Sequence, residues 1–190
     1  MTMEMAELIQ VDLEALVRRA RAGDHGALGE LYDRYHDRVA RFATGRLGDA
    51  ERAEDVTSET FEGVLRGLPG YRPGTDFEAW LFTIAHRRVA DHFRRRARRR
   101  EVDLDEAGTA AAATAAGPED AVLAAERRAE VALAFRRLRP DQQEVLALRV
   151  LGGLSAAQVA KVVGKSEGAV RVAQHRALLD LRAQMGVTVR

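Results

Sequence analysis

Residues 75–100 read TDFEAWLFTIAHRRVADHFRRRARRR, a stretch without proline or glycine. Thr75 and Glu78 fit the Ser/Thr-x-x-Glu capping box, which predicts the beginning of a helix. The apolar residues that follow recur at helical spacing and predict one apolar face: Phe77, Leu81, Ile84, Ala85 and Phe93. The stretch is therefore predicted to form one long helix, around which the rest of the chain is arranged.

Arginines crowd the second half of this helix: Arg87, Arg88, Arg94, Arg95, Arg96, Arg98, Arg99 and Arg100. Cations also favour the negative end of a helix macrodipole, but that effect fades within one turn and does not account for eight arginines. Arginines neutralise phosphates, and the release of counterions then drives binding. The pattern favours contact with nucleic acid over a merely solvated helix end.

The aromatic residues in the first half of the helix leave two interpretations open. Aromatic rings stack on unpaired bases, so Trp80 beside an arginine block is typical of a protein that holds single-stranded or melting nucleic acid. Aromatic residues at helical spacing are, however, more often part of a packed core. Phe77, Trp80, Phe82 and Phe93 are each open to both interpretations.

Length and composition exclude several classes of protein. The 190 residues suit one or two small domains, and 30 Lys+Arg against 29 Asp+Glu leave a net charge of only +1. The absence of cysteine excludes disulfides and zinc thiolate sites. No pattern of a catalytic triad, a P-loop or clustered histidines stands out, so we expect no enzyme activity, no metal and no cofactor. Without a signal peptide or an apolar span, a cytoplasmic protein with no membrane contact of its own is expected.

Three helices are predicted before the central one, at residues 12–22, 27–47 and 50–66, with Asp24 and Asp49 as N-caps. The first ten residues are expected to be frayed or weakly helical. The third helix carries Asp55, Glu59 and Glu62 three to four residues apart, which places them on one face. We interpret this acidic face as an interaction surface rather than as a set of acid/base catalysts.

The chain changes character after the central helix. Residues 101–117 are rich in small residues and are interpreted as a flexible linker. Helices are predicted at 118–138 and from Pro140, followed by a capped pair, Ser155–Val163 and Ser166–Met185, around Gly164. A helix, a short turn with glycine and a second helix indicate a helix-turn-helix, whose polar face would read duplex DNA. A helical hairpin without a DNA role is the alternative.

The prediction for the fold is therefore all-α, with two helical domains joined by a flexible linker. The domains are expected at residues 1–100 and 118–190, with the linker at 101–117.

Three segments resemble the bacterial extracytoplasmic-function (ECF) sigma factors. Ala53–Leu68 (AEDVTSETFEGVLRGL) is similar to region 2.2 of that family, Phe77–Arg99 to regions 2.3 and 2.4, and Leu138–Arg182 to region 4. The segments stand in the family's order and cover well over half of the chain. The resemblance implies a region 2 bundle and a region 4 helix-turn-helix.

The resemblance also implies three sets of site residues. Those for core RNA polymerase are Asp55, Ser58, Glu59, Phe61 and Glu62, with Ser58 where many relatives have glutamine. Those for the promoter minus-ten element are Trp80, His86, Arg87, Asp91, Arg94 and Arg95, next to the loop Gly70–Asp76. Those for the minus-thirty-five element are Arg149, Ser166, Glu167, Arg171, His175 and Arg176.

The function that the resemblance implies is that of an alternative sigma factor, which binds core RNA polymerase and promoter DNA, assists melting and starts transcription. Such a protein is commonly held inactive by an anti-sigma factor, so the resemblance implies that partner as well. Two other functions compete with it. One is a stand-alone regulator that binds duplex DNA through the helix-turn-helix, and the other is an interaction module whose arginine helix packs on acidic partners.

Overall fold

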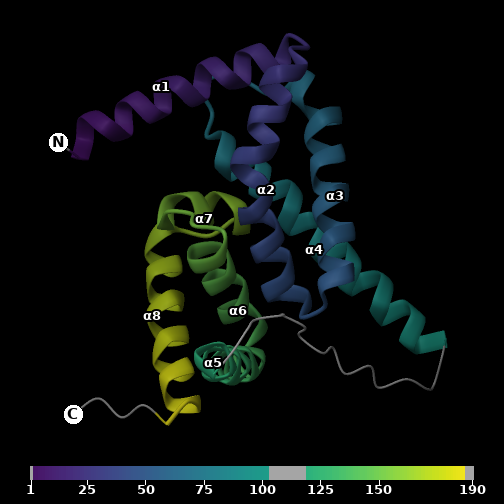
Figure 1. The fold of residues 1–190 in the computed structure, drawn as a ribbon, viewed down its shortest axis with the longest axis vertical. Helices are drawn as coiled ribbons and strands as arrows, with labels where there is room; N and C mark the ends of the chain where they lie inside the picture. Colours follow the sequence, from purple (N-terminus) through teal and green to yellow (C-terminus); the bar gives the residue numbers. More distant parts are fainter. Residues whose placement is uncertain (1, 103–118, 187–190) are drawn as a thin grey trace.

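The computed structural model describes residues 2–102 and 119–186, and every element in that part of the chain is helical (Figure 1). The N-terminal body consists of α1 (Thr2–Arg21), α2 (His25–Leu47), α3 (Ala50–Gly67), the 3₁₀ turn η1 (Leu68–Gly70) and α4 (Phe77–Val102). The C-terminal body consists of α5 (Glu119–Arg136), α6 (Pro140–Leu146), the π-helical turn η2 (Ala147–Leu151), α7 (Ala156–Val163) and α8 (Glu167–Gln184). The predicted all-α fold with two helical domains is confirmed. The predicted linker begins in the last two residues of α4 and otherwise lies outside the described residues.

Short polar side chains and glycines set the helix ends, largely as predicted. The Asp24 carboxylate accepts from the backbone N–H of Ala27 at 3.1 Å, and Asp49 accepts from that of Arg52 at 3.2 Å. Gly48 ends α2 in the left-handed conformation, with φ of 66°. Of the two expectations for the first ten residues, frayed or weakly helical, the helical one agrees with the structure, because α1 already begins at Thr2.

The predicted capping box at the beginning of α4 is also wrong. The helix begins at Phe77, and the Asp76 carboxylate caps it by accepting from the N–H of Ala79 at 3.1 Å. The Thr75 hydroxyl instead donates to the carbonyl of Arg72 at 2.7 Å, inside the preceding loop. Glu78 is thereby left free to bind residues of other helices.

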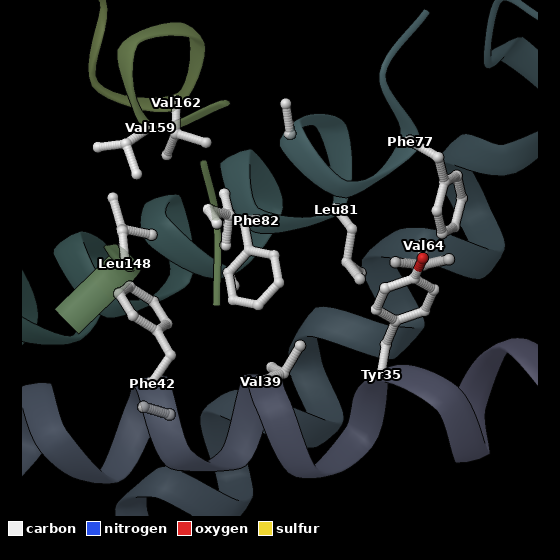
Figure 2. Close-up of a cluster of buried hydrophobic side chains, with 14 of the residues drawn as sticks. Tyr35, Val39, Phe42, Val64, Phe77, Leu81, Phe82, Leu148, Val159 and Val162 are labelled. Atoms are coloured by element: carbon white, nitrogen blue, oxygen red, sulfur yellow. The ribbon is translucent and has the colours of Figure 1, made fainter. Parts of the chain in front are cut away.

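The two bodies share one apolar core. Phe42 of α2 and Phe82 of α4 meet edge to face with ring centroids 5.9 Å apart, and both are fully buried. Leu148 and Val159 of the C-terminal body lie in the same cluster (Figure 2). Phe77 is buried as well, whereas Phe93 is 38% exposed. The core interpretation is therefore correct for Phe77 and Phe82.

The π-helical turn shapes the C-terminal side of this shared core. The N–H of Gly152 donates to the carbonyl of Ala147 at 2.8 Å, five residues back, so the turn is wider than an α-helical one. A Cβ at Gly152 would lie 2.8 Å from the Leu148 carbonyl oxygen and 2.9 Å from the Phe82 ring. Only glycine allows the turn to approach α4 this closely.

A search of the described helices for a membrane span finds none, because none of them combines enough length with enough apolar character.

Phe82→Ala should lower the free energy of unfolding by about 3–5 kcal/mol, since it removes a fully buried ring from the core that both bodies share. Urea unfolding followed by circular dichroism measures the change. Phe93→Ala, in the same helix but exposed, is the control and should cost about 1 kcal/mol or less. Equal losses for the two variants would contradict the assigned core.

Candidate functional site

The predicted polymerase-binding residues gather on α3, beside an apolar surface. Asp55, Ser58 and Glu62 are exposed. The Phe61 ring lies 4.7 Å from the ring of Tyr32 on α2, centroid to centroid. Tyr32 is 44% exposed. The helical spacing of Ala53, Val56, Phe61 and Leu65 predicts that Leu65 is buried, but it is 54% exposed.

The surface on α3 therefore combines carboxylates with an apolar groove, which is lined in part by Leu28, Tyr32, Phe61 and Leu65. Sequence reasoning missed Tyr32, because it lies off the apolar stripe of α2 by which buried positions are recognised. Leu65 belongs to the apolar spacing of α3, so spacing alone did not reveal its exposure. A surface that pairs apolar anchors with charges is typical of a protein–protein interface.

The arginine half of α4 adjoins this surface. Arg87, Arg94 and Arg95 are exposed, and Arg94 forms an ion pair with Asp91. Arg95 reaches across to Glu59 of α3 at 3.4 Å. Exposed ion pairs of this kind contribute at most about 1 kcal/mol, so both arginines stay available to phosphates. Nearby, burial and the charges of Arg52, Arg96 and Arg95 lower the pKa of His92, which keeps its ring neutral at pH 7.

Trp80 agrees with both interpretations that the sequence left open, a place in the packed core and a surface available to a base. One part of its ring packs on Tyr71 and Phe77, with centroids 5.0 and 5.6 Å away, and a Cβ at Gly67 would lie 3.0 Å from it. Another part lines a pocket formed by the loop at residues 70–76, Thr83 of α4 and Lys161 of α7. We call this hollow the Trp80 pocket. An aromatic wall beside an exposed loop is suited to a flat, partly apolar ligand such as a base.

His86 points to the C-terminal body. Its Nε2 bonds the carboxylate of Glu144 on α6, and both side chains are mostly buried. The hydrogen bond from His86 holds the pKa of Glu144 below its usual value, although burial opposes this. Of the six residues predicted for the minus-ten element, His86 and Trp80 thus lie towards the C-terminal body, whereas Arg87, Arg94 and Arg95 face solvent.

The helix-turn-helix forms as the sequence predicts. The Ser155 hydroxyl accepts from the N–H of Gln158 at 3.1 Å, and the Gln158 amide oxygen accepts from the N–H of Ser155 at 2.8 Å. Gly164 turns the chain with φ of 66°, and Ser166 caps α8 by accepting from the N–H of Ala169 at 3.2 Å. The next helix presents an exposed polar face with Glu167, Arg171, His175 and Arg176.

Arg149 and Arg171, both predicted for the minus-thirty-five element, have partners within the C-terminal body. Arg149 donates through Nε to the Gln174 amide oxygen at 2.8 Å and through a terminal nitrogen to the carbonyl of Leu154. Arg171 donates to the carboxylate of Glu167, one turn earlier on α8, at 3.1 Å. Arg149 therefore ties the π-helical turn to α8, whereas Arg171 keeps an exposed guanidinium. Among the described residues, no group of three or more His, Asp or Glu is placed to hold a metal ion.

Comparison with known proteins identifies the family. Residues 31–99 match Sigma-70 region 2, and residues 128–181 match Sigma-70 region 4. The chain is 38% identical over 178 residues to the ECF RNA polymerase sigma factor SigD of Mycobacterium tuberculosis, covering 91% of this chain and 84% of SigD. The chain belongs to the ECF RNA polymerase sigma factors. The resemblance noted in the sequence is thereby confirmed.

Another ECF sigma factor is more similar in sequence but longer. BldN of Streptomyces coelicolor is 47% identical over 167 residues, which are 87% of this chain and 63% of BldN. This chain thus spans less than two thirds of BldN. The fold also matches the structure of the sigma factor RpoE in complex with the anti-sigma factor NepR from Bartonella quintana. The TM-score is 0.72 at 21% identity, covering 85% of this chain and 98% of that one.

Glu144→Gln should produce a loss of stability that depends on pH. Because His86 holds the pKa of Glu144 below its usual 4.5, the carboxylate stabilises the folded protein above pH 4.5 and loses that effect as the pH falls further. The difference in unfolding free energy between wild type and variant should therefore shrink as the pH falls below 4.5 in urea titrations. Glu130→Gln, at an exposed position of α5, should show no such difference. A difference that stays constant with pH would contradict the assignment.

Proposed function

We propose that this ECF sigma factor is an alternative sigma factor that binds core RNA polymerase, recognises the minus-ten and minus-thirty-five elements of its promoters, assists melting and starts transcription. The observation that carries the proposal is the presence of three distinct surfaces in one chain. They are the acidic and apolar surface of α3, the arginines of α4 beside the Trp80 pocket, and the exposed polar face of α8. The polymerase performs the chemistry, and this protein is not itself an enzyme.

Core polymerase is proposed to bind the α3 surface. Phe61 with Tyr32 and Leu65 supplies apolar anchors, and Asp55, Glu59 and Glu62 supply the charges, with Ser58 between them. Anchors in an apolar groove provide affinity, and surrounding charges provide the rate and the register of association.

The minus-ten element is proposed to bind at α4 and the preceding loop. The arginines Arg87, Arg94 and Arg95 would hold the backbone of the non-template strand, and one unstacked base would enter the Trp80 pocket. Removing a base from the stack costs a few kcal/mol, which contacts in a pocket must offset. Asp91 orients Arg94, and His86 would reach DNA once it is released from Glu144.

The minus-thirty-five element is proposed to bind α8 as duplex. Helix-turn-helix proteins place the second helix in the major groove, with residues near its N-terminus on the base edges. Glu167, Arg171, His175 and Arg176 are exposed on that helix, and the backbone N–H groups that follow the cap at Ser166 would face a phosphate of the duplex. Arg149 would act at the edge of this surface while it holds Gln174.

The domain limits and a protein partner complete the proposal. The functional units are residues 1–100 and 118–190, joined by residues 101–117, and they act in the cytoplasm, where core polymerase is found. The RpoE structure is a complex with an anti-sigma factor, and the fold of this chain is similar. We propose that an anti-sigma factor of this kind holds the present protein inactive by covering its polymerase-binding surface.

Run-off transcription tests the function as a whole. Purified core polymerase is incubated with a promoter library, with and without this protein. Specific transcripts that require the protein would establish a sigma factor, and their shared upstream elements would give its promoter. No transcripts, together with tight duplex binding by the protein alone, would favour the stand-alone regulator.

Arg171→Ala and Asp55→Ala should separate the two binding partners. Arg171→Ala should cost about 1–3 kcal/mol of promoter binding by the holoenzyme and leave core affinity unchanged. Asp55→Ala should weaken core binding by about 1 kcal/mol, or roughly fivefold, without changing promoter preference. Fluorescence anisotropy measures both affinities. Arg128→Ala and Glu51→Ala, at exposed positions of α5 and α3, are matched controls. Loss of core affinity in Arg171→Ala would count against the assignment.

A further inference from the structure

The exposed face of α8 has an apolar centre. Val170 and Ala177 are fully buried on the opposite side of the helix, where Gln174 also bonds Arg149. Each residue of an α-helix turns the chain by about 100°, so Val172 lies nearly opposite Val170. The Val172 side chain is 51% exposed. Val172 therefore points away from the protein, at the middle of the face that is proposed to enter the major groove.

Charged and polar side chains flank this apolar centre. By the same angular step, Arg171 and His175 lie to one side of Val172 and Arg176 lies to the other, and all three are exposed. The Arg171 guanidinium donates to the Glu167 carboxylate, one turn earlier. Side chains that can reach phosphates and the polar edges of bases thus frame one that forms only apolar contacts.

Gly168, one turn before Val172, leaves a recess beside it. Apart from its chain neighbours and the helix backbone, nothing lies within 4 Å of the point where a Cβ of Gly168 would be. Side chains of a helix lean towards its N-terminus, so the Val172 methyl groups tilt over this empty position. Cβ positions four residues apart are about 5–6 Å from each other, which lets one methyl group from outside touch Val172 and the Gly168 backbone together.

The fold itself requires neither residue. Gly168 is not among the glycines with positive φ, so α8 needs glycine there neither for space nor for conformation. Glycine and valine are both poorer helix formers than alanine, glycine through backbone entropy and valine through its restricted side chain. An exposed valine gains little from burial to offset this. What the pair provides is a small apolar recess in a charged surface, a feature that suits a ligand.

The major groove offers an apolar group of the right size. Of the four bases, only thymine presents a methyl group there, next to its O4 acceptor. Helix-turn-helix proteins place the beginning of the second helix against the base edges. Gly168 and Val172 both lie in the first two turns of α8, which begins at Glu167.

We propose that Gly168 and Val172 form a receptor for the methyl group of one thymine in the minus-thirty-five element. Val172 is then a specificity-determining residue, and Gly168 lets the helix approach the base closely enough for the contact. The surrounding Arg171, His175 and Arg176 supply contacts that do not depend on the methyl group. The proposal rests on the proposed function of α8, and it names a base that this helix selects without a hydrogen bond.

The test removes the methyl group and nothing else. Holoenzyme assembled from the full chain and core polymerase first selects its preferred sites from a randomised duplex library. In the selected duplex, each thymine of the upstream element is replaced in turn by deoxyuridine, which keeps every hydrogen-bonding group and lacks only the methyl. Fluorescence anisotropy measures each affinity. Wild type should bind about fourfold more weakly when one particular thymine is replaced, because the methyl contact is lost.

Val172→Ala should abolish this uracil penalty. The variant should bind the thymine duplex about fourfold more weakly than wild type and should bind the thymine and uracil duplexes equally well. Leu179→Ala is the matched control. Leu179 is 48% exposed on the same face but lies seven residues further, about 10 Å along the helix, so its removal should leave the penalty as in wild type.

Gly168→Ala tests the close approach. Because nothing opposes a Cβ there, the variant should unfold at the same urea concentration as wild type or at a higher one. It should nevertheless bind the selected duplex about fourfold more weakly, with no uracil penalty, since the added methyl group fills the recess. An unchanged affinity and penalty in Gly168→Ala would overturn the receptor.

The outcomes separate this proposal from the function on which it rests. If a duplex is selected and none of its thymines shows the penalty, or if Val172→Ala keeps it, the receptor is overturned while the duplex-reading role of α8 stands. If no upstream sequence is selected, the proposed function fails and the receptor fails with it. A penalty that Val172→Ala and Gly168→Ala remove and Leu179→Ala keeps supports the proposal, because misfolding would weaken binding to every duplex alike.

Discussion

The contact between Phe82, Phe42 and Leu148 is the one on which the rest of the structure depends. It brings α2, α4 and the π-helical turn into a single core, so the two helical bodies pack against each other instead of having separate cores. The orientation of α4 follows from it. With Phe77 and Phe82 buried, the arginines of the second half are carried out to solvent, as Figure 1 shows for the projecting end of the helix.

A polar layer lies beside this core and determines the orientation of one body relative to the other. Apolar packing alone tolerates small rotations of one body against the other. Arg38, by contrast, can donate to both Glu78 and the Gly152 carbonyl only when the two bodies are in one orientation. Hydrogen-bonded charges that are removed from water specify an arrangement more than they stabilise it. The shared core holds the bodies together, and the polar layer determines which faces meet.

Local chemistry made much of this fold predictable. Asp24, Asp49, Ser155 and Ser166 cap helices where the sequence places them, because an N-cap depends on residues only a few positions apart. The helix-turn-helix and the family follow from spacing of the same kind.

What the sequence did not predict involves partners distant in the chain. Glu78 was assigned to a cap, yet it binds Arg38 and Gln158, 40 and 80 residues away. The contact of His86 with Glu144 is a second such case, and Trp80 both packs in the core and lines a pocket. Helical periodicity gives the face on which a residue lies but not the partner that covers that face, so these contacts required the structure.

The ion pair between Glu59 and Arg95 links two surfaces that otherwise have separate roles. Under those roles, polymerase that engages Glu59 releases Arg95 for a phosphate, and a phosphate on Arg95 releases Glu59. The two ligands are then thermodynamically coupled, because the factor by which one raises the affinity for the other equals the factor by which the other raises the affinity for the first. Under the proposed roles, a single exposed salt bridge, of little value to stability, would make assembly of the holoenzyme and capture of the promoter mutually reinforcing.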